Sequence, residues 1–199
     1  MEKQLIISVG REYGSGGHEI AQRLSEHYGI QLLDHNLLDE IAAAKNMDMQ
    51  HLKELDEKHR SRLTSRTVRG YSSSLEENLY LIQFDHLRKK ASSGESFVIV
   101  GRCSETILKA YDSLVSIFVL GDMDKKIDRI MKLYGLSKEQ AVRRIREKDM
   151  KRRRYHNGHC DRRWGDSRNY DIAINSSKLG IDGTVAMLAD YIDRRRTPQ

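Results

Sequence analysis

The stretch QLIISVGREYGSGGHEIAQRLSEHYG, residues 4–29, decides the fold. Its apolar start at 5–9 is short and β-branched, as expected of a buried strand. The loop that follows holds four glycines, Gly10, Gly14, Gly16 and Gly17. After the loop, apolar residues recur at helical spacing as far as Tyr28, and Gly29 stands where a helix would end. A strand, a glycine-rich loop and a helix in this order bind phosphate through backbone N–H groups and the positive end of the helix.

This loop departs from the standard phosphate loop, G-x-x-x-x-G-K-[ST], at the two positions whose side chains contact phosphate and magnesium. When Gly16 is aligned with the last glycine of that motif, Gly17 takes the lysine position and His18 takes the hydroxyl position. We expect Arg11 to supply the positive charge that the lysine would have given. The residues expected to bind the donor phosphates are Gly14, Ser15, Gly16, Gly17 and His18. A plain strand-to-helix turn is the alternative, but such a turn does not require so many glycines.

Length and composition fit one domain with insertions, because 199 residues are enough for a substantial core. The sequence has no apolar run of 18 residues and no signal-peptide pattern, so we expect no membrane segment. Cys103 and Cys160 are the only cysteines. Two cysteines disfavour a disulfide framework and favour a reducing, cytoplasmic compartment.

Positive charge is concentrated in residues 143–154, which hold eight cations and two acids, against 35 cations and 29 acids in the whole chain. A solvated helix face is the usual explanation of such a run. Like charges on adjacent helical turns repel, however, and a bound anion relieves that repulsion. The run therefore indicates an anionic partner, which can be nucleotide phosphates, nucleic acid or a membrane surface.

The rest of the chain alternates between short apolar runs, typical of buried strands, and segments with helical spacing. Further strands are expected at 30–33, 97–100, 114–120 and 170–175. Helices are expected after caps at Asn36, Ser74, Asp122 and Ser137, weakly over 48–63, and over 184–192. Residues 64–73 and 155–169 have the composition of loops.

Strands that alternate with helices predict an α/β fold with a parallel sheet covered on both faces. Ligands of such sheets bind beyond the carboxyl ends of the strands. The glycine loop, Asp34 and Arg102 each follow an expected strand, so we expect them to converge on one edge of the sheet.

Four motifs occur in the order found in cytidylate kinases. They are the loop REYGSGG at 11–17, LLD at 32–34, VGRC at 100–103 and the basic REKDMKRRR at 146–154. The closing stretch YDIAINSSKLGIDGTV at 170–185 also resembles the end of that fold. The chain therefore resembles the cytidylate kinase-like family over nearly its whole length.

The resemblance implies a three-layer P-loop NTPase-type fold with a five-stranded parallel sheet, a helical insertion and a basic lid. It divides one kinase-like domain, 1–199, into a core at 1–34, 94–135 and 167–199, an acceptor-binding insertion at 35–93 and a lid at 136–166. It also implies ATP as the donor and Mg²⁺ as its companion ion.

The resemblance further implies roles for individual residues. Asp34, Arg102, Arg153 and Arg154 are expected to bind the acceptor substrate. Lys148 and Lys151 match lid arginines of the family. Together with Arg152 of the basic run and Arg11 of the loop, they are expected to act on the transferring group, because charge spreads over it in the transition state.

Several positions differ from cytidylate kinases. Cys103 replaces an aspartate, His35 a serine, Glu40 a substrate-binding arginine, and Arg152 a lid aspartate that helps to recognise cytosine. The groups that would read the base are largely replaced, while those that would bind phosphate remain. The resemblance therefore does not predict cytidylate as the acceptor.

Three functions remain open from the sequence. The first is ATP-dependent transfer of phosphate to a small acceptor, such as a nucleoside monophosphate. The second is a nucleotide-binding module without turnover, in line with the missing lysine. The third is a nucleic-acid binder through 143–154, which leaves the glycine loop without a purpose. A membrane partner is not expected.

Two clusters near the basic run carry less weight. His156, His159 and Cys160 could form part of a metal site, but no second ligand pair has the spacing typical of zinc. Tyr155 and Trp164 could stack on bases or pack over a nucleotide.

Overall fold

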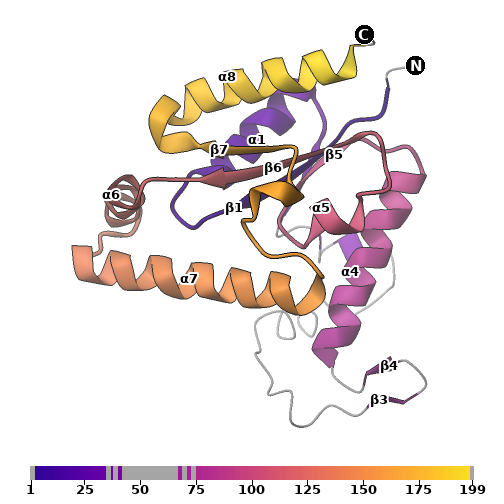
Figure 1. Ribbon diagram of the computed structural model, residues 1–199, viewed down its shortest axis with the longest axis horizontal. Coiled ribbons are helices and arrows are strands. Elements are labelled where there is room, and N and C mark those ends of the chain that lie inside the picture. The colour runs from indigo at the N-terminus through magenta and orange to yellow at the C-terminus, as the bar shows by residue number, and fades with distance from the viewer. Residues whose placement is uncertain are drawn as a thin grey trace.

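A five-stranded parallel sheet lies at the centre of the computed structural model, in the order β2-β5-β1-β6-β7 (Figure 1). The strands are β1 (Ile6–Arg11), β2 (Gln31–Leu33), β5 (Phe97–Val100), β6 (Leu114–Leu120) and β7 (Ile172–Asn175). Every pair of neighbouring strands is parallel. The structure describes residues 3–34, 37, 40, 41, 67, 68, 71, 72 and 75–197. The predicted five-stranded α/β fold is confirmed.

The central strands are buried on both faces because their side chains alternate between two hydrophobic clusters. Ile6 belongs to the cluster beneath α4 (Leu75–Ser92) and α5 (Ser104–Ile107). Ile7, the next residue, belongs to the cluster beneath α1 (Gly17–Tyr28) and α8 (Ser176–Arg196). Figure 1 shows these two helical layers on opposite sides of the sheet.

A third, smaller cluster joins α6 (Met123–Tyr134) to α7 (Lys138–His159) through Ile127, Ile130, Ala141 and Ile145. Tyr13, from the loop after β1, packs against this cluster. The hydrophobic contact therefore holds the basic helix α7 next to the glycine loop.

The predicted caps of these helices are largely confirmed. Gly29 and Gly135 adopt the left-handed conformation that ends α1 and α6. Ser137 and Gln140 form the expected capping box at the start of α7. Asp122 is the N-cap of α6, although its side chain makes no capping hydrogen bond.

The structure corrects the loop predicted at 155–169. Helix α7 continues to His159, and a 3₁₀ turn, η2, occupies Ser167–Asn169. The apolar spacing of α7 ends at Ile145, yet the same inward face continues with polar residues that find partners in the fold. His156 on this face is buried against Glu105. The prediction relied on the spacing of apolar residues, whereas the last part of α7 shows helical spacing only in its buried polar residues.

Other boundaries also differ from prediction. Residues 67–68 (β3, Thr67–Val68) and 71–72 (β4, Tyr71–Ser72) form a two-stranded antiparallel pair within the predicted loop. The short helix α5 was not expected, and α8 begins at Ser176, with non-helical torsions at Gly180. The caps expected at Asn36 and Ser74 and the helix at 48–63 lie outside the described residues. The division into core, insertion and lid therefore stays a prediction.

None of the helices in the described part of the chain combines the length and apolarity that a bilayer-spanning segment requires.

Candidate phosphate-binding site

The glycine loop between β1 and α1 has the close-packed backbone expected of a phosphate cradle. Gly14 and Gly16 have φ angles of 86° and 78°, in the left-handed region that favours glycine. A Cβ on Gly16 would collide with Cδ1 of Ile181, and one on Gly17 would lie 2.5 Å from Cβ of Arg11. No lysine fits at the Gly17 position unless Arg11 moves.

Four N–H groups of the loop have no acceptor within the described part of the chain, namely those of Gly14, Gly16, Gly17 and His18. The N-cap residue of α1, Gly16, has no side chain to cap the helix. Other loop amides are engaged, since the N–H of Ser15 donates to the Glu12 carbonyl and the N–H of Tyr13 donates to Asp149. The first N–H groups of α1 therefore have no acceptor in the described part of the chain, and the start of a helix is where an anion binds best.

Arg11, the last residue of β1, lies beside Gly17. Its guanidinium occupies the space next to Gly101, where any side chain would collide with Nη1. Burial lowers the pKa of Arg11 to about 9, and the nearby charge of Arg152 acts in the same direction. Its buried Nε has no hydrogen-bond acceptor among the described residues. A buried, charged donor without an acceptor is a position that a bound anion would stabilise.

Arg152 reaches the loop from α7. Its Nη1 donates a hydrogen bond to the carbonyl of Arg11 at 3.2 Å, and its guanidinium lies 5.4 Å from the ring centre of Tyr13. Burial also lowers the pKa of Arg152, while Asp149 raises it. Two arginines from distant parts of the chain thus concentrate positive charge at the start of α1.

Asp149 and Lys126 complete the inner side of the loop, and both were missed in the sequence. The Asp149 Oδ1 accepts a 2.7 Å hydrogen bond from the N–H of Tyr13. Burial raises the pKa of Asp149, against the hydrogen bond from Tyr13 and the charge of Lys126. Lys126 is 5% exposed and forms an ion pair with Glu12 at 2.8 Å. The sequence did contain a signal for Lys126, because this lysine stands on the apolar face of α6, beside Ile127 and four residues before Ile130.

Asp34 and Arg102 lie at the same edge of the sheet, as predicted. The Asp34 carboxylate is 3.4 Å from Nδ1 of His18. Arg102 follows β5 with a φ of 60°, and Cys103 has a φ of 57°. Two successive non-glycine residues in the left-handed region form a strained turn, of the kind often found at functional sites. The charges of Asp34 and Arg102 both act on Arg11, so the three side chains share one electrostatic environment.

Four basic residues of α7 that were predicted to act at the site lie away from this cluster, whereas Arg144 donates a hydrogen bond from Nε to the Tyr13 hydroxyl at 3.1 Å. Lys148, Lys151, Arg153 and Arg154 are exposed. Arg153 instead lies over Trp164, with 5.6 Å between the guanidinium carbon and the ring centre. Their predicted roles stay predictions.

The two aromatic residues beside the run take part in packing. Trp164 packs edge-on against Phe118 at a centroid distance of 5.3 Å. Tyr155 packs against His159 at 4.5 Å.

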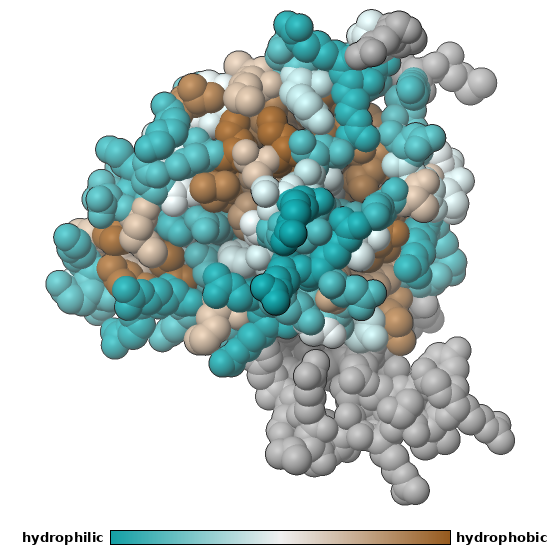
Figure 2. All heavy atoms as spheres, viewed as in Figure 1, coloured by the Kyte–Doolittle hydropathy of each residue, from teal (hydrophilic) through white to brown (hydrophobic). Residues whose placement is uncertain are grey.

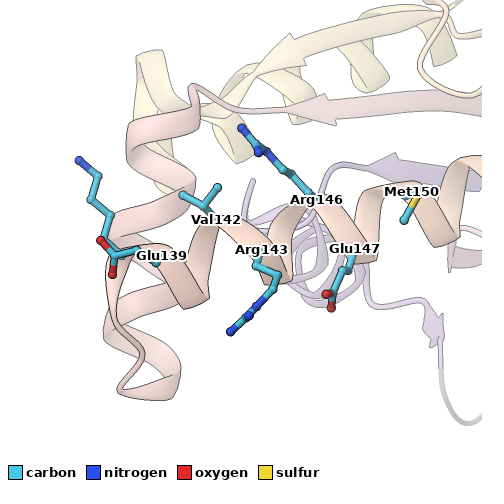
Figure 3. A pocket seen from close by; sticks show the side chains of 7 residues that line it. Glu139, Val142, Arg143, Arg146, Glu147 and Met150 are labelled. Carbon is cyan, nitrogen blue, oxygen red and sulfur yellow. The ribbon is translucent and has the colours of Figure 1, made fainter.

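A pocket lies along the outward face of α7, between Lys138 and Met150 (Figure 3). Figure 3 shows its labelled side chains spread along the helix and pointing away from a common centre. Its lining residues are Lys138, Glu139, Val142, Arg143, Arg146, Glu147 and Met150. Within the described part of the chain, none of them hydrogen-bonds to the glycine loop. Figure 2 shows hydrophilic residues along α7, in keeping with a solvated helix face.

The loop and its neighbours offer Mg²⁺ only a small set of oxygen ligands. His18 stands at the position of the usual hydroxyl, and the Ser15 hydroxyl already donates to the Glu12 carbonyl. Asp34, which faces His18, offers a carboxylate. Mg²⁺ commonly takes one or two carboxylates and fills its shell with water and substrate phosphates, so Asp34 suits it.

Comparisons with known proteins find similarity along most of the chain. Residues 6–178 match the model of the cytidylate kinase-like family. A cytidylate kinase from Pyrococcus horikoshii is 25% identical, over 96% of this chain and 89% of that protein. A cytidylate kinase from Methanopyrus kandleri is 22% identical, over 95% and 93% of the two chains.

Solved structures share the fold. An uncharacterized protein from Eubacterium ventriosum is 38% identical, with a TM-score of 0.76 over 96% of this chain and 99% of that chain. A gluconokinase from Sinorhizobium meliloti, 12% identical, has a TM-score of 0.55 over 98% and 97% of the two chains. A shikimate kinase from Bacteroides thetaiotaomicron, also 12% identical, has a TM-score of 0.54 over 95% and 98%.

Proposed function

This chain belongs to the cytidylate kinase-like family, and from that premise we propose that it transfers the γ-phosphoryl group of ATP to a small acceptor. The family and the kinase fold together support a kinase-type phosphotransferase. The donor, the acceptor and the role of each residue are parts of the proposal.

One observation carries the proposal: the N–H groups at the start of α1 have no acceptor among the described residues, and neither has the buried Nε of the neighbouring Arg11. These N–H groups belong to Gly16, Gly17 and His18, and a Cβ on Gly17 would lie 2.5 Å from Cβ of Arg11. A polyphosphate offers oxygens to all of these donors at once, which a single carboxylate does not.

The mechanism that follows relies on positioning and charge, because phosphoryl transfer requires little covalent chemistry from the protein. The loop amides would hold the donor phosphates in place. Arg11, fixed beneath Gly101, would supply the charge that a loop lysine normally gives. Arg152 would neutralise charge that develops on the transferring oxygens, since it reaches the loop from α7.

The acceptor would bind on the β2 and β5 side of the loop. Arg102 would hold an anionic group of the acceptor with its planar fork. Asp34 would lie between acceptor and donor, next to His18. Mg²⁺ held with the ATP phosphates by Asp34 would add charge neutralisation. Because Cys103 and Arg152 replace cytidylate-reading residues, a nucleoside monophosphate other than CMP, or a different small acceptor, fits this proposal.

The test measures formation of ADP with ATP, Mg²⁺ and a panel of nucleoside monophosphates and small hydroxylated acids. We expect one acceptor class to accelerate ADP formation above the rate with water alone. With that acceptor, Arg152→Ala should lower kcat by about 10²-fold, as is typical when one transition-state donor is lost. Arg143→Ala, on the exposed face of α7, is the matched control and should leave kcat unchanged.

A nucleotide-binding module without turnover is the second candidate, favoured by the Asp149 carboxylate that already holds the N–H of Tyr13. ATP binding by the intact chain, with no ADP formed across the whole panel, would support this candidate and reject the first. Failure to bind ATP at all would reject both.

A further inference from the structure

Three metal-ligating side chains from two distant segments meet on the α4 and α5 side of the sheet. Cys103 lies in the strained turn after β5, whereas His156 and Cys160 lie at the end of α7. The two sulfur atoms and a ring nitrogen of His156 all lie within 4.8 Å of one another. We propose that Cys103, His156 and Cys160 form a binding site for a thiophilic divalent cation, with Zn²⁺ as the best match.

The distances suit a tetrahedral metal after a small contraction. In a zinc site with bonds of about 2.3 Å to sulfur, two ligand sulfurs are roughly 3.8 Å apart. The present group is wider by about 1 Å at most, given its upper limit of 4.8 Å. Cys103 and His156 are 2% and 4% exposed, so a metal here would be shielded from water on most sides.

The histidine provides an independent reason to expect a ligand. Its Nε2 contacts Oε1 of Glu105 at 2.6 Å, while its buried Nδ1 has no hydrogen-bond partner among the described residues. Metal-bound histidines commonly donate their second N–H to a carboxylate, which fixes the ring and leaves the first nitrogen for the metal. Glu105 therefore orients His156 as it would in a metal site.

A simple pair of thiols explains less. Cys103 and Cys160 are both free cysteines, and a thiol contact or a disulfide between them would satisfy the sulfurs alone. The Nδ1 of His156 would still be buried without a partner. A metal satisfies all three groups at once. Two sulfurs and one imidazole nitrogen form a soft ligand set that suits zinc and leaves its fourth position to water.

His159, which the sequence grouped with this site, is engaged elsewhere. Its Nδ1 lies 2.6 Å from the carbonyl of Tyr155, and its ring packs against Tyr80 and Tyr155. The missing third ligand is Cys103, 57 residues from Cys160 in the sequence. A bound metal would fasten the end of α7 to the turn that carries Arg102.

The test uses the full chain, stripped of metal with a chelator and kept reduced with a phosphine. Titration with Co²⁺ should give a thiolate-to-cobalt charge-transfer band that saturates at one equivalent per chain. Zn²⁺ should displace Co²⁺ and abolish the band. Cys103→Ser and Cys160→Ser should each remove the band and weaken Zn²⁺ binding at least 100-fold, measured against a chromophoric chelator.

Two further variants distinguish the metal ligands from nearby residues that do not bind the metal. Glu105→Gln should keep the band but weaken Zn²⁺ binding about 10- to 100-fold, as expected of a group that orients a ligand. His159→Gln is the matched control and should bind like the unmodified chain. Circular dichroism must show that each variant is folded.

Two results would overturn the proposal. One is a folded, reduced chain that binds Co²⁺ and Zn²⁺ no more tightly than the double variant C103S/C160S. The other is a loss in His159→Gln as large as in Cys103→Ser. If the cysteine variants do not fold, X-ray absorption of the zinc-loaded unmodified chain decides. Two sulfur neighbours support the site, and a shell of oxygen and nitrogen alone rejects it.

Discussion

Asp149 connects the basic helix α7 to the glycine loop through a single carboxylate. It accepts the N–H of Tyr13 at 2.7 Å and lies 3.8 Å from both Lys126 and Arg152. Burial nevertheless raises the pKa of this carboxyl above its ordinary value, so the ionised form is less stable in the fold than in the unfolded chain.

Asp149→Asn should therefore raise the free energy of unfolding at pH 7. A carboxyl whose pKa is higher in the folded state destabilises the fold at every pH above that pKa. This destabilisation of the fold decreases as the pH falls through the folded-state pKa, and it is absent below the unfolded-state pKa of about 3.9. Asparagine keeps an oxygen that accepts the Tyr13 N–H, so the hydrogen bond is preserved.

Urea unfolding of both chains between pH 7 and pH 4 measures the effect. The advantage of Asp149→Asn should shrink as the pH falls. Asp128→Asn, an exposed position on α6, is the control and should show no such trend. A loss of stability in Asp149→Asn at pH 7 would contradict the prediction.

Gly16 tests the loop backbone more directly. Gly16→Ala places a Cβ against Cδ1 of Ile181, and it forces an alanine backbone into the left-handed region at a φ of 78°. We expect the variant to lose about 1–3 kcal/mol of unfolding free energy and to bind ADP at least 10-fold more weakly, because the loop must shift. Urea unfolding and calorimetric titration measure the two quantities.

Gly135→Ala separates crowding from backbone strain. Gly135 has a φ of 62°, but a Cβ there meets nothing within 4 Å. This control should lose about 1 kcal/mol of stability from the left-handed backbone and bind ADP normally. Equal losses of ADP binding in the two variants would contradict the assignment of Gly16 to the site.

Sequence reasoning found the residues that follow strands but missed those that come from helices. Arg11, Asp34 and Arg102 were found because parallel strands end at one edge. Lys126 and Asp149 have no motif, and only the packing of α6 on α7 brings them to the loop. Arg152 comes from a helix too, but it was predicted only as one cation of the basic run, with no geometric reason behind it.

Helix α7 is held at its start by a local motif. Ser137 accepts the N–H of Gln140 at 3.3 Å, and Gln140 accepts the N–H of Ser137 at 2.9 Å. Ser137→Ala should cost about 1 kcal/mol of unfolding free energy, because a helix amide loses its cap. Urea unfolding measures the cost.

Lys138→Ala is the matched control for the cap, since Lys138 is exposed in the same turn. It should change the free energy of unfolding by less than about 0.5 kcal/mol. The capping interpretation is wrong if both substitutions cost the same.

The starts of elements were easier to predict than their ends. The capping box at Ser137 and the apolar run at 114–120 have local signals, and both were predicted correctly. The end of α7 has no such local signal, because His156 continues the inward face through a buried hydrogen bond with Glu105. The start of α8 at Ser176 was also missed, since Gly180 interrupts its spacing.

Binding of ATP should stabilise the chain as a unit, because a ligand that binds only the folded state shifts the unfolding equilibrium. At a free ATP concentration 100 times the dissociation constant, the free energy of unfolding should rise by about 2.7 kcal/mol. For a chain of this size the expected rise in Tm is roughly 5–11 °C. Thermal unfolding with and without ATP measures the rise.

Gly16→Ala provides the control for that rise and should show little of it. A short single-stranded DNA tests the nucleic-acid alternative in the same assay. A large, steeply salt-dependent rise with DNA, and none with ATP, would favour binding through residues 143–154.

The alternation of strands and helices was enough to predict a parallel α/β sheet. The strand order β2-β5-β1-β6-β7 was not predicted. It depends on which hydrophobic faces of strands and helices pack together over long sequence distances. The antiparallel pair of β3 and β4 was missed too, since two-residue strands carry almost no periodicity.

The phosphate loop is completed by residues that the ribosome adds long after it. Ser176 donates its hydroxyl to the carbonyl of Ser15, across 161 positions of sequence, and Ile181 packs against Gly16. A nascent chain therefore exposes an unfinished cradle during most of its synthesis. If the loop binds a nucleotide as proposed, the nucleotide cannot assist the early steps of cotranslational folding, because the site is complete only after the last helix has docked.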